Sequence, residues 1–325
     1  MIAQFAALLK EWSAYLPPLT REPDFDRFWA EARAESQRAP LQVTRTALDY
    51  PLGGVAVSDV TYRGTDGTRI HGWFLTPAAR AGQRLPCLVH YHGYGGDRGR
   101  PVDFLAWLTL GMAVLSVDCR DQSGETGNAA AWSGGSLGNH FLRGILDPAE
   151  SYVRCLCLDA LRALDVACAQ PEVAPDGIVV EGGSQGGALT VTAAALDPRP
   201  VLALPDVPSN SDLASRVLNG NGVYGTLAEY LKRHPERTET CLRTLSYFDT
   251  MNMAEGIRAR LYVSVGGRDP VCPAKCFFAT YNRIRAPKDM EIYWFNGHEG
   301  GGVRHFERKL RVAQQFLAAR SGQPA

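Results

Sequence analysis

The first fifty residues carry the hydrophobic pattern of amphipathic helices. Near the N-terminus, apolar side chains recur at the three- and four-residue spacing of one helix face: Phe5, Leu8, Leu9 and Trp12. The segment 23–39 places Phe25, Phe28 and Trp29 on one face in the same way. We therefore expect residues 1–50 to form a helical extension.

From Val57 onward the pattern changes to short apolar runs. Two β-rich runs, 57–64 and 69–77, flank Asp66-Gly67, a pair typical of a hairpin turn. Nearly continuous apolar runs then predict strands at 86–93, 112–120, 177–184, 199–208, 259–267 and 290–295. Helical patterns fall near 103–110, 152–169, 186–196, 274–284 and 306–319. This alternation predicts an α/β fold with a mostly parallel sheet and helices on both faces.

Between residues 209 and 257 the alternation is replaced by polar, helix-like sequence. We interpret this segment as a small cap inserted between two strands, over the sheet edge where open α/β sheets bind ligands. No internal repeat or low-complexity tract divides the chain. We expect one α/β domain over residues 1–325, with the helical extension and the cap as its additions.

Composition narrows the functional classes. Lysine plus arginine and aspartate plus glutamate both number 34, so the formal net charge is zero. A nucleic-acid partner is not expected, because such proteins carry excess basic charge, and an anionic membrane surface is not expected either. The N-terminus does not have the pattern of a signal peptide, since Lys10 and Glu11 interrupt its apolar stretch. The eight cysteines are expected to be free thiols that mostly pack as small apolar residues.

The strongest chemical signal is the segment Gly182-Gly183-Ser184-Gln185-Gly186-Gly187. It fits the G-x-S-x-G pattern, with an apolar strand before it and a helix-forming run after it. That context is typical of a nucleophile elbow, a tight strand-to-helix turn that presents a serine. The alternative is a glycine-rich turn that carries an incidental serine. We predict that Ser184 is a nucleophile.

A serine nucleophile needs a general base, and three histidines follow Ser184. His298 lies in a loop after a predicted strand, where it can reach the elbow. His234 falls in the cap at a polar helix end, and His305 falls near the start of the last helix, where a structural role is expected. His298 is therefore the predicted base.

In this fold the acid lies between the serine and the histidine along the chain. Asp269 follows the strand 259–267, and its carboxylate would fix the imidazole and stabilise its protonated form. Asp206 and Asp249 are the rivals, with turn or capping roles as their alternative. Chain order and loop position favour Asp269.

Ester cleavage also needs donors for the developing oxyanion. One expected donor is the backbone N–H of Gln185, and the other is that of Tyr94 in the loop after an early strand. His90 and His92 have the spacing of a metal pair, but no third ligand accompanies them. No metal and no cofactor are expected.

Together these segments resemble the acetyl xylan esterase / cephalosporin C deacetylase family, carbohydrate esterase family 7. The resemblance spans nearly the whole chain and is carried by HGYGGDRGR at 92–100, RGILDP at 143–148, GGSQGG at 182–187, RTLSYFD at 243–249 and HEGGG at 298–302. The family's triad maps onto Ser184, Asp269 and His298, and its oxyanion donors map onto the amides of Tyr94 and Gln185. Its Arg-Gly-Gln motif falls on Arg120, Asp121 and Gln122, where Arg120 and Gln122 are expected to keep the structural role.

Asp121 replaces the glycine of this motif, so the conformation of the local turn does not follow from the resemblance. We expect the loop 123–139 to line the entrance to the site differently from typical members of the family. The resemblance implies removal of acetyl groups from small saccharides such as xylo-oligosaccharides, and from cephalosporin C. It also implies a cytoplasmic enzyme, commonly hexameric, whose partner is a small acetylated substrate. Two alternatives stay open: a carboxylesterase, thioesterase or peptidase of the same fold, and a non-catalytic binding protein.

Overall fold

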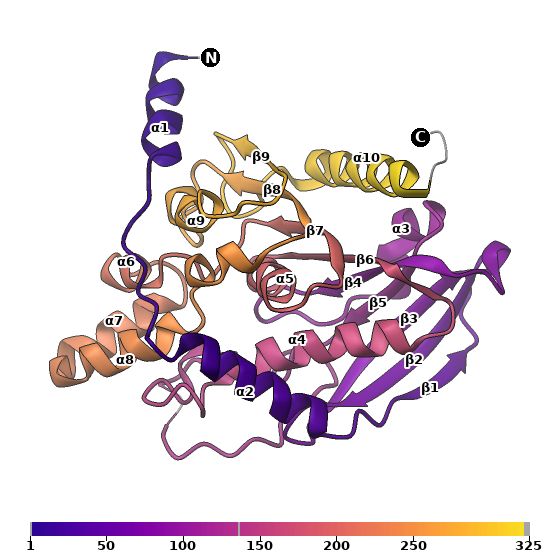
Figure 1. Cartoon of the computed structure of the whole chain (residues 1–325), viewed down its shortest axis with the longest axis horizontal. Helices are drawn as coiled ribbons and strands as arrows, with labels where there is room; N and C mark the ends of the chain where they lie inside the picture. Colours follow the sequence, from indigo (N-terminus) through magenta and orange to yellow (C-terminus); the bar gives the residue numbers. More distant parts are fainter. Residues whose placement is uncertain (1, 136, 322–325) are drawn as a thin grey trace.

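A nine-stranded sheet forms the centre of the molecule in the computed structural model, which describes residues 2–135 and 137–321 (Figure 1). The strand order is β1-β2-β3-β5-β4-β6-β7-β8-β9. The strands are β1 (Thr44–Leu48), β2 (Val55–Arg63), β3 (Arg69–Pro77), β4 (Leu85–Tyr91), β5 (Ala113–Val117), β6 (Val173–Gly183), β7 (Pro200–Asp206), β8 (Arg260–Gly266) and β9 (Lys288–Tyr293). The pairs from β5 to β9 are parallel, while β1, β2 and β3 form an antiparallel edge that joins β5. The predicted mostly parallel sheet is confirmed.

Helices cover both faces of this sheet, as predicted. In Figure 1, α3 (Leu105–Thr109) and α10 (Gly302–Ser321) lie on one side, and α2 (Phe25–Arg38) and α4 (Tyr152–Ala169) lie on the other. The side chains of the central strands alternate between these layers. Val180 packs in the larger core with α4 and α5 (Gln185–Leu196), whereas its neighbour Val179 packs in the smaller core with α3 and α10.

The N-terminal segment is partly different from our prediction. The helices α1 (Ala3–Ser13) and α2 form where the apolar periodicity placed them. Residues 44–48, however, form the edge strand β1 rather than a helix, so the all-helical interpretation of residues 1–50 is wrong. Every residue of β1 is exposed, and Thr44 pairs with Thr61 of β2. A partner strand therefore stabilises β1, and such pairing leaves little trace in the local hydrophobic pattern.

The hairpin and the inserted segment appear where they were expected. Gly67 has a φ of 85° in the turn between β2 and β3, a conformation that suits glycine. Residues 209–257 contain α6 (Leu213–Leu218), α7 (Tyr224–Arg233) and α8 (Thr238–Ser246), and this insertion separates β7 from β8. After β8, α9 (Ala274–Tyr281) returns the chain to β9.

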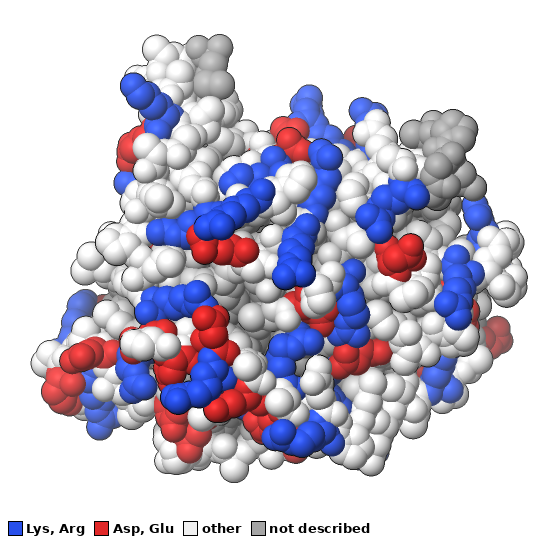
Figure 2. Space-filling view, in the orientation of Figure 1, with Lys and Arg blue, Asp and Glu red and all other residues white. Residues whose placement is uncertain are grey.

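All eight cysteines are free thiols, six of them buried and two, Cys155 and Cys168, half-buried. Positive and negative side chains are interspersed over the face seen in Figure 2, in keeping with their equal numbers in the sequence. Within the described ranges, no helix has both the length and the apolar character needed to cross a bilayer.

Candidate active site

The carboxyl ends of the parallel strands bring the predicted site residues to one edge of the sheet. Ser184 follows β6, Asp269 follows β8, and His298 follows β9. Loops at this edge carry the functional groups of open α/β sheets. Three segments that are distant in sequence therefore converge on one place.

Ser184 occupies the turn between β6 and α5 with a φ of 57° and a ψ of −115°, an uncommon conformation for a residue other than glycine. Its amide donates to the Asp206 carbonyl at 2.9 Å, which holds the turn against β7. A Cβ on Gly182 would lie 2.3 Å from the Tyr91 carbonyl oxygen, and a Cβ on Gly186 would lie 1.9 Å from it. The glycines on both sides of Ser184 are thus required by the close approach of β4.

A chain of hydrogen bonds links the three predicted residues. The Ser184 Oγ lies 2.9 Å from His298 Nε2, and His298 Nδ1 lies 2.8 Å from Asp269 Oδ2. The other carboxylate oxygen, Asp269 Oδ1, accepts the amide N–H groups of Val271 and Cys272 at 2.8 and 2.9 Å. The Asp269 side chain is fully buried, whereas that of His298 is 34% exposed. The carboxylate is therefore fixed from two sides, and the imidazole faces the site.

The rival acids have other partners, although Asp206 is itself a lining residue of the cavity that contains Ser184. The Asp206 carboxylate faces α10, where its Oδ2 accepts from Lys309 Nζ at 2.6 Å, and its Oδ1 accepts from Ser264 Oγ at 2.8 Å and lies 3.0 Å from His305 Nε2. Burial opposes ionisation of Asp206, but the charge of Lys309 outweighs it and lowers the pKa of the carboxyl group. Asp249 caps a helical turn and accepts amides of the inserted segment, and burial raises its pKa to about 7. Neither carboxylate contacts His298.

The other histidines have separate partners. His305 lies in α10, with its Nδ1 3.1 Å from the Tyr293 hydroxyl, and the His234 ring lies 4.6 Å from the Tyr230 ring, tilted by 37°, at the end of α7. His90 Nδ1 lies 2.5 Å from Glu181 Oε2, while His92 Nε2 accepts the Cys119 amide at 2.7 Å. His90 and His92 thus have different hydrogen-bond partners and do not converge on one metal position.

One group of described residues has the composition of a metal site: Asp269, Cys272 and His298, whose donor atoms lie within 4.8 Å of one another. Both ring nitrogens of His298 already take part in the hydrogen bonds to Ser184 and Asp269. A metal ion bound to either nitrogen would break that chain, so the arrangement suits proton transfer better than metal coordination.

The loop with Tyr94 lies directly against the serine turn. A Cβ placed on Gly93 would be 3.9 Å from the Ser184 Cβ, and the Gly95 amide donates to Gln122 Oε1 at 2.8 Å. Gln122 Nε2 in turn donates to Gln185 Oε1 at 2.8 Å. Gln122 therefore ties together the two segments that carry the predicted oxyanion donors, Tyr94 and Gln185.

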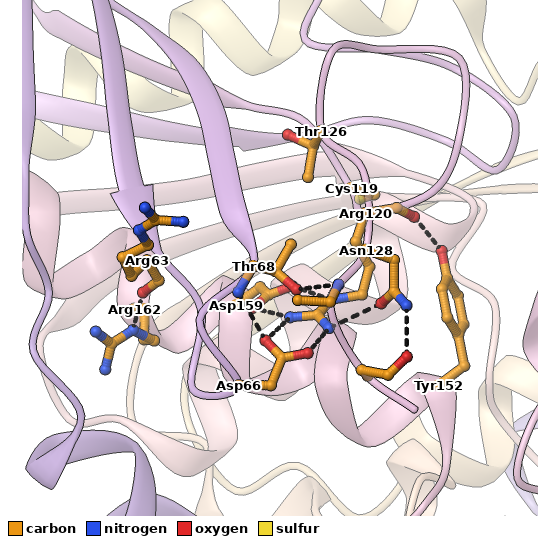
Figure 3. A network of polar contacts seen from close by, with 12 residues as sticks. Arg63, Asp66, Thr68, Cys119, Arg120, Thr126, Asn128, Tyr152, Asp159 and Arg162 are labelled. Atoms are coloured by element: carbon orange, nitrogen blue, oxygen red, sulfur yellow. Dashed lines mark hydrogen bonds and ion pairs between the residues drawn. The ribbon is translucent and has the colours of Figure 1, made fainter. Parts of the chain in front are cut away.

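The Arg120 side chain lies in a buried network with Asp66 and Asp159 (Figure 3). Its guanidinium pairs with Asp159 through Nε and Nη2, at 2.7 and 2.8 Å, and with Asp66 through Nη1 at 2.6 Å. The Tyr152 hydroxyl donates to the Arg120 carbonyl at 2.6 Å. Arg120 thus secures the chain immediately before Gln122.

Asp121 takes the left-handed conformation, with a φ of 57°, that a glycine would adopt without cost. Its carboxylate pairs with Arg143 Nη1 and lies 3.7 Å from His140 Nδ1. The turn His140–Leu142 is thereby tied to the Arg120-Asp121-Gln122 segment. Arg143 belongs to the RGILDP segment, for which the sequence offered no role.

These groups surround a cavity of about 530 Å³. Its walls include Ser184, His298 and Tyr94, together with three residues that our sequence reasoning missed: Phe141, Cys272 and Arg216. The inserted segment supplies Ser209, Arg216 and Val223 to these walls. The described residues of 123–139 are not among the lining residues, and Ser136 lies outside the described residues, so the expectation that this loop lines the entrance differently stays a prediction. No motif marks the missed residues, because they come from different elements that only folding brings together.

Comparisons with known proteins agree with this geometry. The sequence model of the acetyl xylan esterase family matches residues 2–316. The curated acetyl esterase Axe7A of Xylanibacter ruminicola is 28% identical over 311 residues, which cover 92% of this chain and 69% of that protein. The solved acetyl xylan esterase from Paenibacillus sp. R4 is 42% identical with a TM-score of 0.91, over 94% of this chain and 99% of that chain. Acetyl xylan esterase 1 from Thermoanaerobacterium sp. JW/SL YS485 is 28% identical with a TM-score of 0.87, over 94% and 98%. These likenesses confirm the predicted α/β-hydrolase fold.

Proposed function

The chain belongs to the acetyl xylan esterase family, and from that premise we propose that it removes acetyl groups from small acetylated saccharides with Ser184 as its nucleophile. Membership makes the protein a carboxylic ester hydrolase. The observation that carries the mechanism is the hydrogen-bonded chain from Ser184 through His298 to Asp269, at 2.9 and 2.8 Å, on the wall of the cavity.

In the proposed reaction, the Ser184 Oγ attacks the acetyl carbonyl carbon while His298 Nε2 takes the hydroxyl proton. The buried Asp269 accepts a hydrogen bond from His298 Nδ1, which fixes the tautomer and stabilises the imidazolium. The amide N–H groups of Tyr94 and Gln185 donate to the oxygen that becomes negative, and loss of one such donor typically costs about 3 kcal/mol of transition-state stabilisation.

The saccharide alcohol then leaves with the proton from His298, and an acetyl group stays on Ser184. Water attacks this acyl-enzyme while His298 again takes a proton, and acetate departs. A cavity of about 530 Å³ is large enough for a small saccharide ester. We extend the proposed substrates to xylo-oligosaccharides and to the acetyl ester of cephalosporin C. We also propose that the enzyme is cytoplasmic and forms a hexamer. Light scattering in solution tests the hexamer.

The direct test is acetate release from acetylated xylo-oligosaccharides by the wild type and by a Ser184→Ala variant. The variant should lose about three orders of magnitude or more in kcat, because nucleophilic catalysis is removed while the fold is kept. A second comparison uses acetate, butyrate and octanoate esters of one alcohol. A preference for octanoate would overturn the acetyl-ester proposal, and undiminished hydrolysis by the variant would overturn the role of Ser184.

A further inference from the structure

Arg216 is a buried cation on the wall of the cavity that contains Ser184. It belongs to α6 in the inserted segment, and only 2% of the residue is exposed. Its Nη1 donates to Ser209 Oγ at 2.9 Å, and its Nη2 donates to the Val271 carbonyl at 2.7 Å. Its Nε is buried with no hydrogen-bond partner among the described residues.

Two other fully buried arginines show what is unusual about Arg216. Arg120 pairs with the carboxylates of Asp66 and Asp159. Arg162 has no carboxylate bond, but each of its three nitrogens donates to at least one backbone carbonyl. Arg216 alone of the three lines a cavity while one of its nitrogens lacks a partner.

The side chains that directly contact the Arg216 guanidinium are neutral. The Asp269 carboxylate, within 4.8 Å of the Cys272 Sγ, is bound to His298 instead. Cys272 Sγ lies 3.7 Å from Nη2, and burial raises the pKa of this thiol, which therefore stays protonated. The ring of Tyr224 faces the guanidinium at 4.7 Å, and burial raises the pKa of its hydroxyl as well. In the part of the chain that the structure describes, no ion pair includes Arg216, and a buried charge is costly without a counter-ion.

Arg216 is also close to the reacting groups. Ser209, which accepts from Arg216, donates its amide N–H to the Ser184 carbonyl at 3.0 Å. Val271 and Cys272, on the other side of the guanidinium, are the residues whose amides hold Asp269. One small molecule can therefore place its ester at Ser184 and an anionic group at Arg216.

We infer that Arg216 forms a subsite for a carboxylate on the alcohol part of the substrate, which makes acetyl esters of acidic saccharides, such as uronic acids, the preferred class. This inference rests on the proposed acetyl-ester hydrolysis at Ser184. An acetyl group has no charge to offer, so the carboxylate must belong to the sugar. Guanidinium N–H groups bind carboxylates through charge-assisted hydrogen bonds, which are stronger than neutral ones.

The test compares two substrates of nearly the same shape, of which only the first carries a negative charge: an O-acetylated methyl glucuronoside and its carboxamide. The wild type should hydrolyse the carboxylate form with a kcat/KM about 10-fold higher or more. Arg216→Met should remove most of that preference, chiefly through KM, while Arg216→Lys should keep part of it. Arg162→Met is the matched control: it removes another buried arginine, and the preference should stay unchanged.

A purely structural Arg216, which only holds Ser209 and Val271, would give a different result. Arg216→Met would then lower hydrolysis of both substrates equally, and that outcome overturns the subsite. If the variant does not fold, the wild type still decides the question through inhibition of 4-nitrophenyl acetate hydrolysis. Deacetylated methyl glucuronoside should inhibit about 10-fold more strongly than its carboxamide, and equal inhibition overturns the subsite.

The same assay separates this inference from the proposed function. Hydrolysis of 4-nitrophenyl acetate that is lost in Ser184→Ala supports the function, even where the carboxylate preference is absent and the subsite alone is wrong. Absence of any Ser184-dependent ester hydrolysis overturns the proposed function, and the subsite with it.

Discussion

Two polar clusters near the serine turn each contain a buried aspartate but use it in opposite ways. The open cluster consists of Ser184, His298 and Asp269, and the closed cluster consists of Arg120, Asp66 and Asp159. In the closed cluster, the guanidinium is 1% exposed and each of its nitrogens meets a carboxylate oxygen (Figure 3). In the open cluster, only the carboxylate is buried, while the serine and the imidazole line the cavity.

The comparison shows that polar groups whose hydrogen bonds are all made within the protein stabilise the fold, whereas groups with hydrogen-bonding capacity left can act on a substrate. A saturated, buried network has no capacity left for a substrate and contributes to one fixed structure. A hydroxyl and an imidazole at a cavity wall keep that capacity. Gln122 connects the two clusters, because its Nε2 lies 2.9 Å from the Tyr152 hydroxyl, which bonds Arg120, and 2.8 Å from Gln185 Oε1.

The largest effect should come from Asp269→Asn in the open cluster. The amide cannot accept the His298 Nδ1–H in the same way, so the imidazole loses the tautomer that accepts the serine proton. We expect kcat to fall by about 10³- to 10⁴-fold, as in other serine triads, with the unfolding midpoint in urea nearly unchanged. Asp206→Asn is the control, because that carboxylate faces Lys309 instead of His298. A larger loss of activity in Asp206→Asn than in Asp269→Asn would reverse the assignment of the acid.

Arg120→Met should have the opposite effect to Asp269→Asn: a large loss of stability and a small change in kcat. Two carboxylates, Asp66 and Asp159, would stay behind without their cation, and breaking a buried ion pair on one side costs about 3–5 kcal/mol of the free energy of unfolding. The folded fraction should keep its kcat within about one order of magnitude, since Arg120 does not line the cavity. Urea unfolding and kcat per folded molecule check both parts. Full stability with abolished activity would show that the closed cluster takes part in the chemistry.

A second closed cluster behind the serine turn predicts a dependence on pH. Lys309 is 3% exposed on its side chain and pairs with Glu181 and Asp206. Burial works against ionisation of both carboxyl groups, yet the Lys309 charge lowers the pKa of each below its ordinary value. Stability from such groups is present above the ordinary pKa of about 4 and is lost as the pH falls toward the lowered values.

Lys309→Met removes this contribution. The wild type should therefore have the larger free energy of unfolding at pH 7. The difference in this free energy between the wild type and the variant, the gap, should narrow by roughly 1–3 kcal/mol as the pH falls from about 5 to 3. Urea unfolding at a series of pH values measures the gap. A gap that stays constant or widens toward pH 3 would contradict the role of Lys309.

The sequence predicted the open cluster better than the closed ones, for a physical reason. Ser184 stands in a motif in which Gly182 and Gly186 have a steric cause, and His298 and Asp269 follow recognisable strands. Their positions at one sheet edge follow from the order of elements along the chain. The strand alternation likewise predicted most of the sheet. The edge strand β1 was missed because its pairing with β2 stabilises it, and its own residues are all exposed.

The closed clusters and Arg216 could not be predicted in this way. Lys309 meets Glu181 across 128 residues, and Arg120 meets Asp66 across 54. In the sequence, Lys309 and Arg216 are ordinary charged residues on helices, and the motif that marks Arg120 does not indicate Asp66 or Asp159 as its partners. Their pairing depends on which side chains the packed layers bring face to face, and that is a property of the tertiary structure.

The smallest effect is expected at Asp121, which stands between the side chains that serve the two clusters. Asp121→Ala removes the ion pair with Arg143 and keeps a left-handed backbone that costs an alanine about 1 kcal/mol. Asp121→Gly removes the same ion pair, but glycine adopts this conformation freely. Because the pair is partly exposed and contributes about 1 kcal/mol or less, we expect the glycine variant to unfold near the wild-type midpoint. The alanine variant should be about 1 kcal/mol less stable than the glycine variant in urea unfolding.

Equal stability of the two would show that the backbone at Asp121 carries no strain. A glycine variant with a several-fold higher KM would show that the Asp121–Arg143 pair also positions Phe141 at the cavity, which would place this pair in the open cluster rather than between the two.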